Sequence, residues 1–157
     1  MKSASISEIK QELTNIHPKE LLELCLRVIK YKKDNKELIN YLLFEAHDLS
    51  TYIENIKKEI DEQFLEINFS NLYFVKKSLR KILKITNKYI KYTASKEAEV
   101  ELLIYFCEKI KLSGVKINKS AALANLYNNQ IKKIKAVVET LHEDLQHDHN
   151  KVIEKLL

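Results

Sequence analysis

The sequence is poor in residues that interrupt helices and in residues that build several familiar binding sites. Its 157 residues include one glycine, one proline and no tryptophan. Loops that cradle the phosphates of a nucleotide need several glycines, so a single glycine excludes them. No alternating apolar run and no glycine-marked hairpin indicates a β-strand. The composition that remains is typical of a chain that is helical throughout.

Long hydrophobic runs are also missing. No apolar stretch approaches the roughly 18 residues that span a bilayer, and the opening MKSASISEIK lacks the apolar centre of a signal peptide. We therefore expect a soluble, cytoplasmic protein with no membrane partner. The two cysteines, Cys25 and Cys107, lie in apolar periodic stretches, which favours buried and unreactive thiols over a disulfide.

Apolar residues make up 45% of the chain and charged residues 31%, which is a globular balance. A chain of this length can bury a core without disulfides, so we predict one helical domain over residues 1–157. Apolar positions recur at spacings of three and four, which predicts an all-α fold. We expect six or seven helices in antiparallel pairs, as an irregular bundle or a short HEAT-like stack.

Start signals divide the chain into these helices. Capping residues are predicted at Ser5 (with Glu8), His17, Asp34 (with Glu37), Ser50, Ser70 and Ser95. Helix pairs are expected over residues 18–48, 51–92 and 96–145. The segment VELLIYFCEKI should be the most buried helix, and Gly114 should follow it in a left-handed conformation. The last helix is predicted to begin near Lys119 and run towards the terminus, with residues 146–157 as an extended or docking tail.

The run SISEIKQELTNIHPKELLELCL, followed by NKELINYLLFEAHD, resembles small all-helical bacterial proteins. The resemblance covers about the first third of the chain and contains no diagnostic motif. It implies a bacterial helical protein. It implies no activity, because that family has none assigned.

Positive charge is concentrated in one part of the chain. Residues 70–135 hold 15 cations and 4 acidic residues, and FVKKSLRKILKITNKYIKY, residues 74–92, holds seven cations and no carboxylate. At about 100° per residue, the cations fall on one side of the predicted helix and the apolar residues on the other. The cations are Lys76, Lys77, Arg80, Lys81, Lys84, Lys88 and Lys91. They form a row roughly 22 Å long at about 1.5 Å per residue.

Two interpretations of this row stay open. It is either only a solvated face or a site for a polyanion such as nucleic acid. Like charges at i, i+4 destabilise a helix by about 0.2–0.5 kcal/mol, so an all-positive row indicates an anion from elsewhere. Carboxylates of the preceding helix could pair with Lys76, Lys81 and Lys88 at its edges, which leaves the middle open. The predicted contacts are Tyr73, which could stack on a base, Lys77, Arg80, Lys84, Lys88 and Lys91.

The segment LHEDLQHDH, residues 141–149, concentrates histidines and acidic residues. Zinc-binding helices present histidines at i, i+4, whereas His142 and His147 are five residues apart. Only Glu143 and His147 have a suitable spacing, and two ligands do not form a structural metal site. We therefore predict no metal site and no cofactor, and this pair is the nearest approach to one.

A second class of function would use the last helix. Its apolar residues step by 4, 3, 4, 3 and 4, which is a heptad seam that suits the protein's own core or a partner helix. The seam consists of Tyr127, Ile131, Ile134, Val138, Leu141 and Leu145. Without a catalytic motif, the sequence favours a non-enzymatic binding or scaffold module that binds a polyanion. The alternative is a protein–protein contact or a homo-oligomer formed through this helix.

Overall fold

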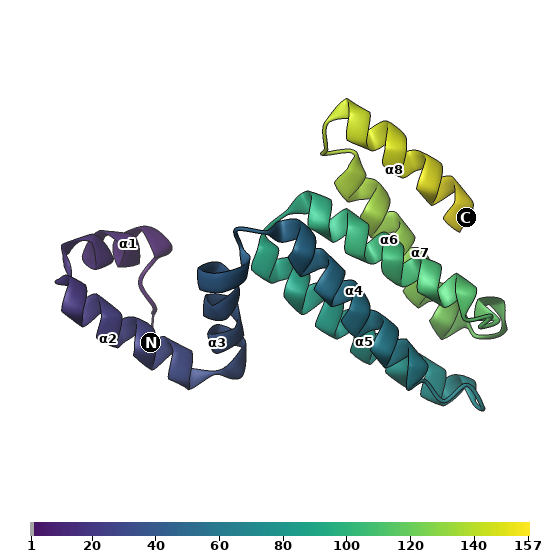
Figure 1. Ribbon diagram of the computed structural model, residues 1–157, viewed down its shortest axis with the longest axis horizontal. Coiled ribbons are helices and arrows are strands. Elements are labelled where there is room, and N and C mark those ends of the chain that lie inside the picture. The colour runs from purple at the N-terminus through teal and green to yellow at the C-terminus, as the bar shows by residue number, and fades with distance from the viewer. Residues whose placement is uncertain (1) are drawn as a thin grey trace. The chain divides into compact units, whose positions relative to one another are not determined.

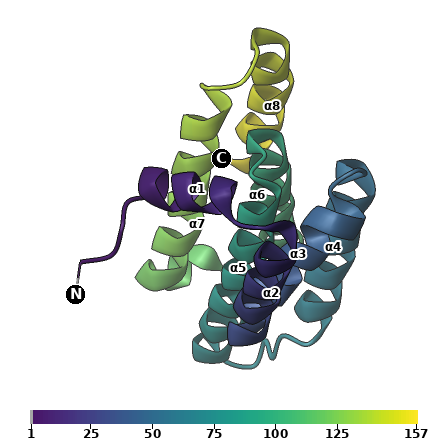
Figure 2. The same ribbon diagram turned by 90° about the vertical axis from the view of Figure 1, so that its left-hand side faces the viewer.

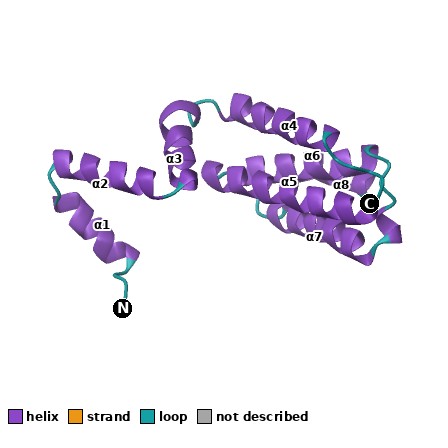
Figure 3. Cartoon of the chain, turned by 90° about the horizontal axis from the view of Figure 1, so that it is seen from below, coloured by secondary structure: helices purple, strands orange, loops and turns teal. Residues whose placement is uncertain are grey.

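The computed structural model describes residues 2–157, which contain helices and loops but no strand (Figure 3). The all-α class is confirmed, and within these residues eight α-helices exceed the six or seven predicted. No helix within residues 2–157 combines the length and the apolar character needed to cross a bilayer. The elements are α1 Ile6–Asn15, α2 Pro18–Tyr31, α3 Lys33–Asn40, a π-helical segment Tyr41–Glu45, α4 Leu49–Leu65, α5 Leu72–Thr93, α6 Lys96–Leu112, a 3-10 turn Ile117–Lys119, α7 Ala121–Val138 and α8 Glu143–Leu156.

These helices gather into two compact units. The N-terminal unit, Met1–Phe44, contains α1, α2 and α3, and the C-terminal unit, Glu45–Leu157, contains α4 to α8. A compact unit is not always one that folds alone. The single folding domain expected over residues 1–157 therefore stays a prediction.

The N-terminal unit has well-formed helix starts and almost no core. Ser5 and Glu8 form the predicted capping box, and His17 Nδ1 accepts a hydrogen bond from the backbone of Lys19 at 3.3 Å. No residue of α1, α2 or α3 is buried. Within residues 2–44 the exposed large apolar side chains are Ile6, Ile9, Leu22, Leu24, Leu26, Val28, Tyr31, Leu42, Leu43 and Phe44.

The C-terminal unit is built around α6. This helix packs against α4, α5, α7 and α8, and the ribbons of these five helices lie together in Figure 1. Eight residues of α6 are buried, more than in any other helix of residues 2–157, which confirms the prediction for VELLIYFCEKI. At its centre the ring of Phe106 meets that of Phe64 edge to face, with centroids 6.0 Å apart. Gly114, with φ 69°, follows α6 in the predicted left-handed conformation.

Most of the predicted helix starts are close to the observed ones, but three of the predicted capping residues are wrong. Asp34 lies inside α3, which begins at Lys33 without a side-chain cap. Asp48 caps α4 in place of Ser50, and Asn71 caps α5 in place of Ser70. Ser, Asp and Asn are about equally good N-caps. Where two of them lie close together in the sequence, the end of the preceding loop determines which one caps the helix, and residue type alone does not predict where that loop ends.

The long last helix of the prediction is divided into α7 and α8. The chain turns after Val138, and His142 caps α8 by accepting a hydrogen bond from the backbone of Asp144. Gln146 Nε2 closes the turn by donating to the carbonyl of Leu141 at 2.8 Å. The apolar spacing continues across the turn because both helices face the same core. The spacing therefore does not indicate that one helix ends and another begins.

The C-terminal residues dock on the unit itself. Figure 2 shows α8 beside α6 and α7, and both helices contact it. Ile153 and Leu156 are buried, and the hydroxyl of Tyr127 donates to the carbonyl of Leu156 at 2.9 Å. The first four residues of the heptad seam, Tyr127, Ile131, Ile134 and Val138, are buried as well. The seam therefore faces the protein's own core.

The exposed large apolar residues of the C-terminal unit share one end of it. They lie at the α4–α5 connection, at the end of α6 and at the C-terminus, all of which are on the right-hand side of Figure 1. We call this set the apolar end: Leu65, Phe69, Leu72, Tyr73, Phe74, Leu112 and Leu157. Leu49, where the chain enters α4, is at the opposite end of that helix.

Candidate polyanion-binding surface

One side of α5 is fixed to the core. The helix begins at the cap Asn71, whose side chain accepts a hydrogen bond from the backbone of Tyr73 at 2.8 Å. Buried residues recur along it at helical spacing: Val75, Leu79, Ile82, Thr86 and Ile90. The buried hydroxyl of Thr86 donates to the carbonyl of Ile82 at 3.0 Å, so it is satisfied within the helix. This packing turns the opposite side of α5 to solvent.

Five cations occupy that solvent side, and we call them the basic face: Lys77, Arg80, Lys81, Lys84 and Lys91. All five are exposed, and none forms an ion pair or a side-chain hydrogen bond within residues 2–157. Lys77, Arg80, Lys81 and Lys84 include pairs that stand three or four residues apart and therefore repel one another, whereas Lys91 lies two turns further along the helix. The fold leaves this repulsion without a compensating carboxylate.

The two other cations of the row, Lys76 and Lys88, are half-buried at its edges. Lys76 Nζ lies 5.7 Å from the ring centroid of Tyr73, and Lys88 Nζ lies 4.9 Å from that of Tyr89. Tyr73 itself is 60% exposed. Of the expected contacts, Tyr73, Lys77, Arg80, Lys84 and Lys91 are therefore open to solvent, whereas Lys88 is held against a neighbouring ring. The expected ion pairs at Lys76 and Lys81 are not formed within residues 2–157.

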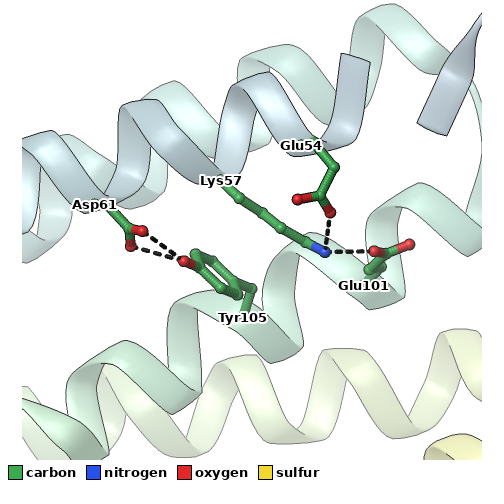
Figure 4. A network of polar contacts seen from close by, with 5 residues as sticks. All are labelled: Glu54, Lys57, Asp61, Glu101 and Tyr105. Carbon is green, nitrogen blue, oxygen red and sulfur yellow. Dashed lines mark hydrogen bonds and ion pairs between the residues drawn. The ribbon is translucent and has the colours of Figure 1, made fainter. Parts of the chain in front are cut away.

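Of the carboxylates of α4, Asp61 is directed towards α6, and Glu54 pairs with Lys57 of its own helix. Figure 4 shows Lys57 between Glu54 and Glu101, with Nζ–Oε1 distances of 2.7 and 2.6 Å. Further along, the hydroxyl of Tyr105 donates to both oxygens of Asp61 at 2.8 Å. These contacts form a polar layer between α4 and α6, and they use acidic groups that would otherwise neutralise a nearby cation.

The ionisation of this layer follows from its contacts. Burial opposes the charge of Lys57, but hydrogen bonds to Glu101 and Glu54 raise its pKa. Burial likewise opposes the charge of Asp61, and hydrogen bonds from Lys109 and Tyr105 lower its pKa. Burial and the bond to Asp61 raise the pKa of Tyr105 to about 12. The groups are held in their ordinary charge states, which is typical of a structural layer.

Sequence reasoning missed this layer, although a signal for it exists. Lys57 and Asp61 are four residues apart on α4, and Glu101, Tyr105 and Lys109 repeat that interval on α6. Residues four apart share a helix face. When the two helices pack together, the cation Lys57 of α4 meets the acid Glu101 of α6. One turn further along, the acid Asp61 of α4 meets the donors Tyr105 and Lys109 of α6.

The lysines of α6 and α7 add less to the positive surface than their number indicates. Lys109 pairs with Asp61 at 2.8 Å and Lys133 pairs with Glu99 at 2.7 Å. Lys111 donates to the carbonyl of Lys155. Lys132 and Lys135 on α7 are exposed and without an ion pair in residues 2–157. The unneutralised charge of the unit is therefore densest on α5.

A pocket of about 260 Å³ lies where the basic face ends. Its lining includes Lys91 from α5, Lys96 from α6 and Lys133 from α7, together with Glu99 and Ser95. Lys133 Nζ also contacts Asn87 Oδ1 at 3.1 Å, which fixes the α7 side of the pocket. The pocket extends the row of cations beyond the C-terminal end of α5.

The other residues that the sequence suggested for a site lie outside the basic face. Glu143 and His147 are exposed on α8, and residues 2–157 contain no group of three His, Cys, Asp or Glu residues that could hold a metal ion. Cys107 is buried, and burial raises the pKa of its thiol to about 12. Cys25 is a free, half-buried thiol. None of these groups joins the basic face.

No family model, no curated protein and no solved structure matches the chain.

Proposed function

We propose that the protein is a non-enzymatic binding or scaffold module that binds nucleic acid through the basic face of α5. The observation that carries the proposal is that five exposed cations on one helix face have no carboxylate partner within residues 2–157. A phosphate backbone supplies the missing negative charge, and contacts from Lys and Arg supply affinity without sequence preference. A cytoplasmic location belongs to the same proposal and agrees with two free cysteines.

The neighbours of the basic face support a single strand more than a duplex. Tyr73 is exposed beside the first cations, where its ring can stack on an unpaired base, and stacking contributes about 1–3 kcal/mol per base. At the other end, Lys91 and Lys96 of the pocket continue the positive path, whereas its third lysine, Lys133, is paired with Glu99. The alternative function through the C-terminal helix has no comparable support, because most of its seam is buried.

Fluorescence anisotropy with labelled single-stranded and duplex oligonucleotides, at 50 and 200 mM salt, tests the proposal. We expect binding at low salt that weakens steeply at the higher concentration, and stronger binding of the single strand. The variant R80E/K84E/K91E should abolish binding. A matched variant with the same change of net charge, K10E/K19E/K36E, alters three exposed lysines of the N-terminal unit and should keep most of it.

Two results would refute the proposal. The first is no binding of either oligonucleotide at low salt. The second is equal loss in the two triple variants, which would mean that net charge and not the face of α5 attracts the ligand. Circular dichroism of each variant establishes that the helices are intact.

A further inference from the structure

Three helices of the C-terminal unit form the pocket at the end of the basic face. Its lining comes from the last turns of α5, the connection to α6, the first turn of α6 and one residue of α7. The connection is tight, because Ala94 adopts a left-handed conformation with φ 49° and the backbone N–H of Ser95 donates to Thr93 Oγ1 at 3.2 Å. This turn brings Lys96, the first residue of α6, into the same pocket as Lys91 of α5.

The residues that line the pocket leave it positively charged. Lys91, Lys96 and Lys133 are its cations and Glu99 is its one acidic residue, so the lining carries a net charge of +2. Glu99 Oε1 pairs with Lys133 Nζ at 2.7 Å. Lys91 and Lys96 are exposed and form no ion pair or side-chain hydrogen bond within the part of the chain that the structure describes. Two positive charges therefore meet at the pocket without a carboxylate partner.

The pocket has the size and the donors for one compact anionic group. Pockets that enclose a whole small molecule usually measure about 300–1,000 Å³, whereas this one measures about 260 Å³. Each lysine ammonium group offers up to three donors. The hydroxyl of Ser95 accepts a hydrogen bond from the backbone of Ala98 at 3.2 Å and keeps its own hydrogen to donate. Such a lining suits a group with several oxygen acceptors, of which a phosphate is the common example.

We propose that this pocket binds the terminal phosphate of a nucleic-acid strand whose backbone lies along the basic face. The inference rests on the proposed function and names the feature of the strand that the site recognises. A terminal phosphate is a monoester with a charge of about −1.5 to −2 at pH 7, whereas a phosphate inside a strand carries a single charge. The net charge of the pocket is therefore complementary to the monoester.

The position of the pocket favours the end of a strand over its middle. Lys91 belongs both to the basic face and to the pocket, so a strand along α5 reaches the pocket without leaving the positive surface. Beyond Lys96, the next charged residues of α6 are Glu97, Glu99 and Glu101. A strand that continued along α6 would meet these carboxylates, and their charge opposes further phosphates.

Fluorescence anisotropy at low salt, with single strands that differ only at their ends, tests the proposal. The strands have one sequence of about eight nucleotides, within the size of known single-strand sites, and a label on an internal base. One has hydroxyl groups at both ends, one has a 5′-phosphate and one has a 3′-phosphate. We expect about three- to tenfold tighter binding of a phosphorylated strand, because exposed ion pairs contribute little individually. The two phosphorylated strands show which end enters the pocket.

A longer strand controls for the added charge. A hydroxyl-ended strand with one more nucleotide also gains a phosphate, but this phosphate is an internal diester. Its affinity should stay close to that of the shorter hydroxyl-ended strand.

Variants of the pocket change the preference in opposite directions. K96Q removes one of the two unpaired cations, so the phosphorylated and hydroxyl-ended strands should bind equally well. E99Q releases Lys133 from its ion pair and should increase the preference for the phosphorylated strand. K58Q is the matched control, because Lys58 is exposed on α4 and does not line the pocket. Opposite effects of K96Q and E99Q cannot both come from a damaged fold.

Equal binding of all strands by the wild-type protein overturns this inference and leaves the proposed function in place. A strand that continued across α7, past Lys132, would give that result. A preference that survives K96Q, or that K58Q removes, overturns the inference as well. No binding of any strand at low salt refutes the inference and the proposed function together.

Discussion

Helices α2 and α6 are both apolar around most of their circumference, yet they have opposite surroundings. In α6 eight of 17 residues are buried, because four helices of the same unit surround it. In α2 none of 14 residues is buried, and within its unit α3 is the main neighbour. Both helices begin at a side-chain cap. The comparison shows that local signals form a helix whether or not the chain supplies a core for it.

Truncating a buried side chain of α6 should have the largest effect on stability. Phe106 is fully buried against Phe64, so Phe106→Ala removes apolar contacts and leaves a cavity, at a cost of about 3–5 kcal/mol in the free energy of unfolding. Urea denaturation followed by circular dichroism measures this value. The milder Ile110→Val, at another buried position of α6, should cost about 0.5–1.5 kcal/mol and remains measurable if the alanine variant does not fold.

The matching truncation in α2 is Leu22→Ala. Leu22 is 59% exposed, so we expect a change within about 0.5 kcal/mol. Equal losses for Phe106→Ala and Leu22→Ala would contradict the difference between the two units.

Acid should weaken the C-terminal unit in part through Asp61. Hydrogen bonds from Lys109 and Tyr105 lower the pKa of Asp61 below its usual 3.8. Its stabilising contribution is therefore complete above about pH 4 and disappears as the pH falls through the lowered folded-state pKa. The carboxylate is partly exposed, so Asp61→Asn should cost about 1 kcal/mol or less at pH 7.

The measurement is urea unfolding at pH 7 and pH 3. The loss of stability between these values should be smaller in Asp61→Asn than in the wild type, because the variant has no carboxylate to protonate at this position. Asp148→Asn is the control, since Asp148 is exposed and forms no hydrogen bond or ion pair within residues 2–157. An unchanged pH dependence in Asp61→Asn would show that the contacts to Lys109 and Tyr105 do not stabilise the fold.

The features that the sequence predicted well depend only on the residues of a single helix. The capping box at Ser5, the burial of α6 and the outward direction of Arg80 and Lys84 all follow from residue spacing within a single element. The basic face is predictable for the same reason, because its residues share one side of a single helix. Its function stays a proposal, because spacing does not reveal the ligand.

The features that were missed depend on contacts between elements. The turn before His142 is invisible in the apolar spacing, because α7 and α8 bury their residues in one core. The acidic residues of α4 were expected to lie beside α5, yet Asp61 pairs with Lys109 of α6. The openness of α2 was missed as well, since the apolar pattern PKELLELCLRVIKY is equally that of a buried helix. Such patterns show that a face needs a partner without showing which one.

Removing residues 1–44 should have the smallest effect on the stability of what remains. The buried residues of the C-terminal unit lie in α4 to α8 and at Ile67, and within residues 2–44 only Tyr41 is buried. The fragment 45–157 should therefore unfold cooperatively, with a free energy of unfolding within about 0.5 kcal/mol of the full chain. Urea denaturation of the fragment and of the full chain, followed by circular dichroism, measures this difference. A fragment that fails to fold would show that the two units form one cooperative domain, as the sequence predicted.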